Sequence, residues 1–326
     1  MSLSIHRKQK QTTDEVQLSF PRSQLVLFQS RKKFALLYCL ATVTGLFCVP
    51  GVFLALSSPD SDLMRIVQMT LPLPLASLLV TAGTYIMNDL VDADLDRANG
   101  KKRPIPSGQV SKKQAWTFVL LAFGAAVLLV ALTASPISLV IVALMLTIGI
   151  TYSMPKIALM KRFVVKTISI AFFYMLCALL GMTSAYNITM AMADPALVAC
   201  VLLTLALMVF ISSTLNDMGD IDGDKAAGRR TIPIVLGKDN TIRLTMGLAA
   251  GVLVITWIFY VVGLAAGHSS LVSSITTTAI VMVVYVTLAN IRKGFHSVEF
   301  IRSQHKKLFP LQMAIHPSII VGVMMI

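Results

Sequence analysis

The sequence is poor in charged residues and in cysteine. Only 13% of its 326 residues are charged, where a soluble domain carries roughly 25%. This scarcity excludes an ordinary soluble globular fold, and the 56% hydrophobic content excludes a disordered chain. The four cysteines lie in apolar stretches without a CxxC pair, so they indicate neither a disulfide framework nor a metal site.

Long uncharged apolar runs are abundant instead. A membrane-spanning helix needs about 20 apolar residues, and two of the runs are about twice that length. Breaks at 133–136 and at 263–270 predict a helical hairpin in each of them. The nine expected spans are 34–57, 66–87, two within 115–155, 167–193, 195–216, two within 244–291, and 308–326. The sequence therefore predicts an all-α integral membrane domain over 34–326 that follows a basic tail over 1–33.

The positive charges are distributed unevenly among the loops. Of the 28 Lys and Arg residues, all but Arg65 fall in the tail or in loops that follow an even-numbered span. Because basic loops stay in the cytoplasm, the tail and these loops are expected there, with the C-terminus on the opposite side. The net charge of +13 is then explained by topology, and nucleic acid is not an expected partner.

More than half of the 15 acidic residues fall in two short segments. Segment 88–96 reads NDLVDADLD and segment 216–224 reads NDMGDIDGD, so both fit the pattern NDxxDxDxD. Each segment directly follows an even-numbered span. The two motifs are therefore expected at the same end of the protein, in two related halves of the domain.

The spacing within the motifs indicates which carboxylates act together. If each span continues through its motif as a helix, three carboxylates of each motif share one face. These are Asp89, Asp92 and Asp96, and Asp217, Asp220 and Asp224. Asp94 and Asp222 point elsewhere. Because Mg²⁺ is typically held by carboxylates together with substrate phosphates, the motifs predict a magnesium site for a polyphosphate. In a bilayer the obvious candidate is a prenyl diphosphate.

Other interpretations of the motifs fit less well. An EF-hand loop begins with a similar pattern, but Arg97 or Lys225 would occupy the position that requires glycine. A solvated acidic loop does not account for the same nine-residue pattern twice. A cation or proton transporter would place carboxylates within the spans, which contain almost no ionisable residues.

Further motifs surround the acidic ones, namely RPIPSG at 103–108, TYSMPK at 151–156 and GRRTIPIVLG at 228–237. Together with the acidic motifs and the nine spans, they resemble the UbiA superfamily of intramembrane prenyltransferases. The resemblance covers nearly all of the chain from the first span to the last. It implies nine helices around a central cavity that is open to lipid, below a cytoplasmic cap of Asp-rich loops. The polar residue that the family places in its first helix has no clear match within 34–57.

The resemblance also implies roles for individual residues. Four aspartates would be catalytic: Asp92, Asp96, Asp220 and Asp224. The Mg²⁺ ligands would be Asn88, Asp89, Asp92, Asp96, Asp217, Asp220 and Asp224. The residues that contact the diphosphate would be Arg103, Tyr152, Lys161 and Arg162.

Three functions remain open at this point. The first is Mg²⁺-dependent transfer of the prenyl group to a small acceptor, expected to be aromatic or a quinone precursor. The second is cyclisation of the prenyl diphosphate to a terpene without an acceptor, which needs the same ionisation step. The third is ion transport through a carboxylate-lined path. The expected partners are a prenyl diphosphate, a small-molecule acceptor for transfer, and the lipid bilayer.

Overall fold

The computed structural model describes residues 17–49, 51–58, 63–98, 102–190, 194–267, 269–294 and 297–325. Over these residues the protein is helical and contains no strand. The elements are α1 (Phe20–Phe47), α2 (Val52–Leu56), α3 (Leu63–Thr70), α4 (Pro72–Val91), α5 (Ala93–Ala98), α6 (Lys112–Ala131), α7 (Pro136–Ser153), the 3₁₀ turn η1 (Leu159–Lys161), α8 (Val165–Thr189), α9 (Pro195–Met218), α10 (Ile221–Ala226), α11 (Ile232–Ala266), α12 (Leu271–Lys293) and α13 (Val298–Met324).

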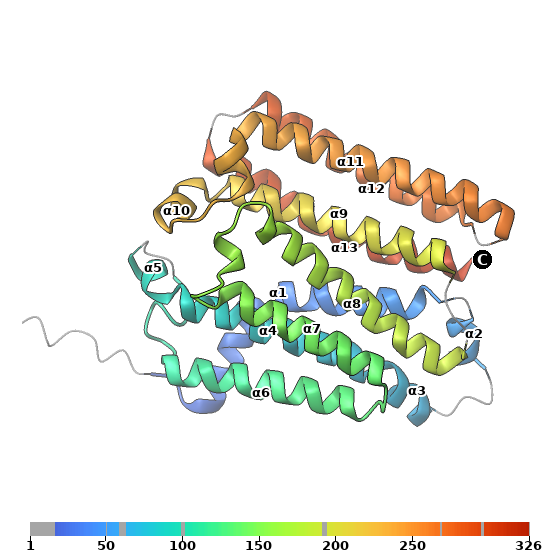
Figure 1. Ribbon diagram of the computed structural model, residues 1–326, viewed down its shortest axis with the longest axis horizontal. Coiled ribbons are helices and arrows are strands. Elements are labelled where there is room, and N and C mark those ends of the chain that lie inside the picture. Colours follow the sequence, from blue (N-terminus) through green and yellow to red (C-terminus); the bar gives the residue numbers. More distant parts are fainter. Residues whose placement is uncertain are drawn as a thin grey trace, which may run out of the picture.

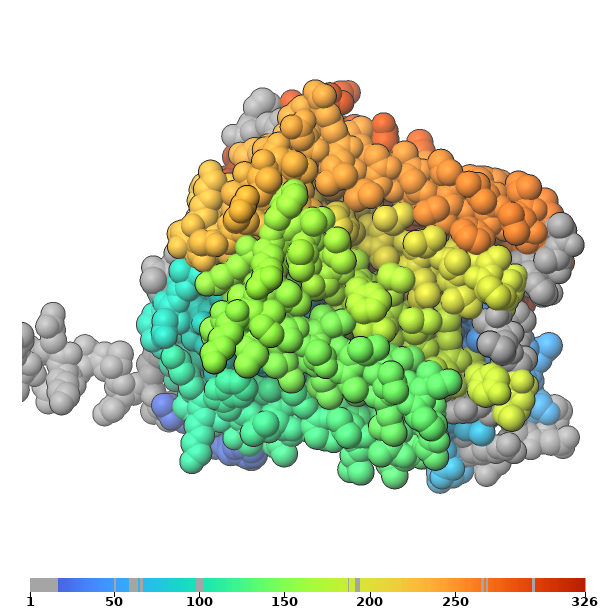
Figure 2. All heavy atoms as spheres, viewed as in Figure 1, coloured from blue at the N-terminus to red at the C-terminus, as the bar shows by residue number. Residues whose placement is uncertain are grey.

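The long helices lie side by side along one direction (Figure 1). The short helices α5 and α10 lie at one end of this bundle, whereas α2, α3 and the C-terminal end of α13 lie at the other. α4 packs on α6, α1 packs on α8, and α9 packs on α11. Figure 2 shows the first half of the chain, through α7 and α8, adjoining α9 and α11 along the length of the molecule.

The helices have the length and composition of membrane spans. In the described part of the chain, 8 helical segments are long and apolar enough to cross a bilayer. They correspond to eight of the nine predicted spans, including both hairpins. Large apolar side chains such as Leu120, Leu128, Val261 and Val283 are exposed on the bundle, as expected for a surface that faces lipid. The protein is therefore an all-α, multi-pass membrane protein.

The first predicted span differs from its helix in the structure. α1 begins at Phe20 and ends at Phe47, instead of covering 34–57. Three consecutive basic residues, Arg31, Lys32 and Lys33, lie within it. They set the predicted start at Phe34, but the helix tolerates them because Lys32 and Lys33 are exposed and Arg31 turns to a carboxylate of α4. α1 nevertheless packs inside the bundle, on α4 and α8.

Candidate functional site

Both acidic motifs lie where a long helix gives way to a short one. α4 ends at Val91 and α5 begins at Ala93; α9 ends at Met218 and α10 begins at Ile221. The condition for the shared face, an uninterrupted helix through each motif, is therefore not met, because Asp92 separates α4 from α5 and the pair Gly219–Asp220 separates α9 from α10. α5 and α10 lie at the same end of the bundle (Figure 1), and the same arrangement occurs twice.

The first motif buries the three carboxylates that were expected to share a face. Asp89, Asp92 and Asp96 are buried, whereas the Asp94 side chain is 75% exposed and pairs with Lys112. Arg31 of α1 donates from Nε to Oδ2 of Asp89 at 2.7 Å and also pairs with Oδ1. Arg103 donates to Asp89 at 2.9 Å and to Asp96 at 2.6 Å.

The second motif is less uniform. Asp217 and Asp224 are buried, and Asp217 forms an ion pair with Lys166, itself buried at the start of α8. Asp220 departs from the predicted face. Its side chain is 40% exposed and accepts from Arg302 of α13 at 2.7 Å. Arg302 also donates to the Gly219 carbonyl at 3.0 Å, so α13 holds the junction between α9 and α10.

Arg229 joins the two motifs. Its Nη2 lies 2.5 Å from Oδ2 of Asp92, and its Nη1 lies 3.2 Å from Oδ1 of Asp224. Burial lowers the pKa of the Arg229 guanidinium, but the two carboxylates raise this pKa by more, and the group stays charged. The carboxylates of both halves therefore meet at one cation.

The residues predicted to contact a diphosphate lie in different places. Arg103 is in the carboxylate cluster, and Tyr152 interacts electrostatically with Lys166 and Asp217. Lys161 and Arg162 are exposed, and Arg162 donates to the carbonyl of Ile157. The structure thus does not bring these last two side chains into the cluster.

Met160 lies inside the cluster, whereas Lys161 and Arg162, the two basic residues that follow it, do not. It is buried, and its sulfur lies 3.1 Å from Nδ2 of Asn88 and 4.0 Å from Nη2 of Arg229. Ala158, two residues earlier, has a left-handed backbone with φ of 43°. That conformation is uncommon outside glycine and is typical of functional sites. It turns the α7–α8 loop so that Met160 points inward.

Four cations of the cluster are not among the predicted site residues. Their pairings are Arg31 with Asp89, Lys166 with Asp217, Arg229 with Asp92 and Asp224, and Arg302 with Asp220. Arg229 belongs to the GRRTIPIVLG motif that follows the second acidic motif, whereas the other three are explained by membrane topology in the sequence. Lys166 offered one signal, because a charge at the edge of an apolar run is costly unless a partner is supplied.

The cluster contains donors suited to Mg²⁺. Among the described residues, no three His, Cys, Asp or Glu side chains lie close enough together to hold a metal ion on their own, because guanidinium and ammonium groups stand between the carboxylates. However, Oδ2 of Asp217 and Oδ2 of Asp224 are buried without a hydrogen-bond partner. Buried carboxylate oxygens normally have a partner, and oxygen is the ligand that Mg²⁺ prefers. The donor set therefore fits the metal.

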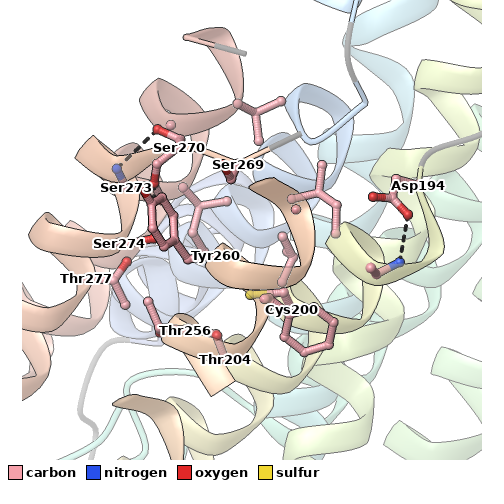
Figure 3. Close-up of a pocket in the computed structure, with 18 residues that line it drawn as sticks. Asp194, Cys200, Thr204, Thr256, Tyr260, Ser269, Ser270, Ser273, Ser274 and Thr277 are labelled. Carbon is pink, nitrogen blue, oxygen red and sulfur yellow. Dashed lines mark hydrogen bonds between the residues drawn. The ribbon is translucent and has the colours of Figure 1, made fainter. Parts of the chain in front are cut away.

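A pocket of about 70 Å³ lies at the opposite end of the bundle from the acidic cluster, between α9, α11, α12 and α13 (Figure 3). Hydroxyl groups line much of it, including those of Tyr260, Ser270 and Ser274. Asp194, the residue that precedes α9, is the only carboxylate among its lining residues, and its side chain accepts from the Ala196 amide. Asp194 is thus the one charged residue in the lining, whereas the acidic cluster gathers several carboxylates and cations.

The amino-acid sequence of this chain is similar to those of named enzymes. A digeranylgeranylglyceryl phosphate synthase of Natronomonas pharaonis is 29% identical over 226 residues, which are 69% of this chain and 75% of the relative. The enzyme of the same name from Methanopyrus kandleri is 28% identical over 213 residues, or 65% of this chain and 74% of the relative.

Solved structures show the same fold. A structure of digeranylgeranylglyceryl phosphate synthase matches 95% of this chain and 100% of its own with a TM-score of 0.68 and 17% identity. A UbiA homolog from Archaeoglobus fulgidus bound to GPP and Mg²⁺ matches 92% of this chain and 99% of its own with a TM-score of 0.65 and 18% identity. The UbiA prenyltransferase family matches residues 44–298, and the chain therefore belongs to this family.

Proposed function

We propose that the acidic cluster binds a prenyl diphosphate with Mg²⁺, and that the protein transfers the prenyl group to a hydroxyl of a glycerol phosphate lipid. The family assignment makes the chain a prenyltransferase and leaves the ion-transport hypothesis without support. The relatives are named for a glyceryl phosphate product. No relative supports the aromatic or quinone-precursor acceptor that was expected first, and we replace it with the glycerol phosphate lipid.

The observation that carries the proposal is a set of buried polar atoms without hydrogen-bond partners. Most of them lie on the segments that form the cluster, and they include both donors and acceptors. They are the hydroxyls of Thr81, Thr84, Ser153, Thr167 and Thr231, Nε of Arg229, Oδ2 of Asp217 and Asp224, and Nε2 of Gln312. Unpaired donors match the oxygens of a diphosphate, and unpaired carboxylate oxygens match a divalent cation.

The metal would be held by the carboxylates of both motifs together with the Asn88 side-chain oxygen. Magnesium supplies charge stabilisation for the leaving diphosphate. The carboxylates proposed as ligands are Asp92, Asp96, Asp217, Asp220 and Asp224, of which Asp217 and Asp224 each have an unpaired Oδ2. Both oxygens of Asp89 pair with Arg31, and we assign Asp89 a supporting role. We place this end of the protein, with the N-terminus, in the cytoplasm because the basic residues gather there.

The chain's own cations complete the site. Arg103, Lys166 and Arg229 are positioned to donate charge-assisted hydrogen bonds to diphosphate oxygens. As the allylic C–O bond breaks, its electron pair leaves with the diphosphate. A lone pair of the acceptor hydroxyl then forms the new C–O bond, and the hydroxyl proton is released. Aromatic rings one or two turns deeper in the bundle are suited to shelter the allylic cation from water. The centroid of the Tyr85 ring lies 5.0 Å from that of Phe34 and 6.4 Å from that of Tyr38.

The proposal is tested with the purified protein, Mg²⁺ and prenyl diphosphates of C15 and C20. Each is offered geranylgeranylglyceryl phosphate, 4-hydroxybenzoate or no acceptor, and the products are identified by mass spectrometry. We expect a prenyl ether of the glycerol phosphate lipid and stoichiometric diphosphate. A prenylated aromatic acid would refute the choice of acceptor. A cyclic hydrocarbon formed without an acceptor would replace transfer by cyclisation.

The assignment of diphosphate contacts makes a separate prediction. Replacing Arg229 with alanine removes a hydrogen-bond donor to a charged group, worth about 1.5–3 kcal/mol. The KM for the prenyl diphosphate should therefore rise by about 10- to 100-fold. Lys161→Ala is the matched control, since Lys161 is exposed outside the cluster, and its KM should stay within about threefold of the wild type. Equal increases in both variants would restore the contact predicted from the sequence.

A further inference from the structure

A buried hydrogen-bonded triad lies far from the acidic cluster, in the apolar part of the bundle. His316 of α13 is completely buried, and so is Tyr174 of α8. Nε2 of His316 lies 2.7 Å from the Tyr174 hydroxyl, and Nδ1 lies 2.7 Å from the hydroxyl of Thr44 on α1. No other buried histidine in the described part of the chain joins three helices through its side chain.

The protons of the triad can be assigned. The Thr44 hydroxyl donates to the Leu40 carbonyl at 2.8 Å, so its oxygen accepts the proton on Nδ1 of His316. Nε2 is then the acceptor of a neutral imidazole, and the Tyr174 hydroxyl donates to it. Each nitrogen of the ring has one partner of the right kind, and the imidazole is fixed in one tautomer and one orientation. A fully paired polar group in an apolar core specifies one arrangement of the helices around it.

The three helices that meet at the triad also carry cations to the acidic cluster. α1 provides Arg31 to Asp89, α8 provides Lys166 to Asp217, and α13 provides Arg302 to Asp220. Between the triad and these cations lie about 12–21 Å of helix, at 1.5 Å per residue. A helix transmits a shift along its axis through its backbone hydrogen bonds. α13 lacks one of these bonds at Pro310, between Arg302 and His316, so we expect stronger transmission along α1 and α8.

We propose that His316 is a positioning residue that sets the relative register of α1, α8 and α13, and thereby the placement of the cations that hold both acidic motifs. Without the imidazole, the Tyr174 hydroxyl keeps only a long hydrogen bond of 3.4 Å to the Leu37 carbonyl of α1, and the three helices settle in more than one register. Arg31, Lys166 and Arg302 then hold their carboxylates less well. This inference rests on the proposed function only in taking the carboxylates to be metal ligands.

The test uses the full-length protein in lipid nanodiscs and two measurements. One is the affinity for Mn²⁺, followed by electron paramagnetic resonance of the free ion. The other is the hydrogen–deuterium exchange of segments 92–98 and 220–227, which needs no metal. The variants are His316→Leu and Tyr174→Phe, with His316→Gln as the conservative replacement that keeps a donor and an acceptor. Thr278→Val is the control, because it removes the hydroxyl that accepts from Trp257 between α11 and α12, helices that carry none of the three cations.

A hydrogen bond between membrane helices is worth about 0.6–1.7 kcal/mol. We therefore expect His316→Leu and Tyr174→Phe to weaken Mn²⁺ binding by about three- to 17-fold and to speed exchange in both segments by a similar factor. The double variant with both His316→Leu and Tyr174→Phe should bind Mn²⁺ no more weakly than His316→Leu alone. His316→Gln should recover part of the lost affinity. The proposal would be overturned if His316→Leu and Tyr174→Phe exchanged at the wild-type rate in both segments. It would also be overturned if Thr278→Val raised the exchange rate as much as they do. Absence of Mn²⁺ binding by the wild type would refute the proposed metal site instead, and the exchange result would still decide the role of His316.

Discussion

Replacing Asp92 or Asp224 with alanine is expected to lower the rate of diphosphate release by about 10³-fold or more. Loss of a single group that stabilises developing charge lowers kcat by about 10²- to 10³-fold. Here each substitution removes a proposed metal ligand as well. Both carboxylates are buried and share Arg229. Each substitution therefore also removes one of the two carboxylates that hold Arg229, the guanidinium shared by both motifs. The rate is measured from released diphosphate with Mg²⁺ and saturating prenyl diphosphate.

Asp94→Ala and Asp222→Ala are the matched controls for this prediction. They remove the same functional group from the same two motifs, at exposed positions. We expect a change of less than about threefold, as is usual for exposed charges. Asp92→Asn keeps the shape of the side chain and separates loss of charge from loss of packing, and thermal unfolding confirms that each variant is folded. Similar losses in all four alanine variants would contradict the division into buried and exposed carboxylates.

This division illustrates how far the sequence alone reaches. The burial of Asp89, Asp92 and Asp96 and the exposure of Asp94 follow from helical periodicity, which survives a break of a single residue at Asp92. In the second motif the break covers both Gly219 and Asp220. The spacing of an ideal helix therefore no longer predicts the direction of the Asp220 side chain, which turns toward Arg302.

The contacts of the cations could not be predicted in the same way. Arg31 and Asp89 are 58 residues apart, and Arg229 and Asp92 are 137 apart. Such pairs depend on which helices are neighbours, and the apolar spans give no specific signal for that. Lys161 and Arg162 were chosen because they follow a recognisable motif. The left-handed backbone at Ala158 decides instead that Met160 points inward, and alanine carries no sequence signal for that conformation.

The contact between α1 and α8 leads to the second large effect. A Cβ atom added to Gly181 would lie 1.8 Å from the carbonyl oxygen of Thr42, and one added to Gly45 would lie 1.8 Å from that of Ala178. Both neighbours are helix backbone, which cannot move aside as a side chain does. Small residues of this kind let membrane helices approach closely and gain van der Waals contact. Gly181→Ala is therefore expected to force the two helices apart.

Separation of α1 from α8 would loosen both ends of the contact. Deeper in the bundle it would stretch the hydrogen bonds that join Thr44, His316 and Tyr174. At the acidic cluster it would displace Arg31 and Lys166 from their carboxylates. We expect a loss of stability of about 4 kcal/mol or more, the range of an overpacked core that also breaks buried pairs.

Gly124→Ala in α6 is the control, because an added Cβ there meets no atom within 4 Å. Alanine should raise helix stability slightly at that position, by about 0.5–1 kcal/mol. Thermal unfolding in detergent distinguishes the two, and an unchanged unfolding temperature for Gly181→Ala would show that α1 and α8 are not in backbone contact.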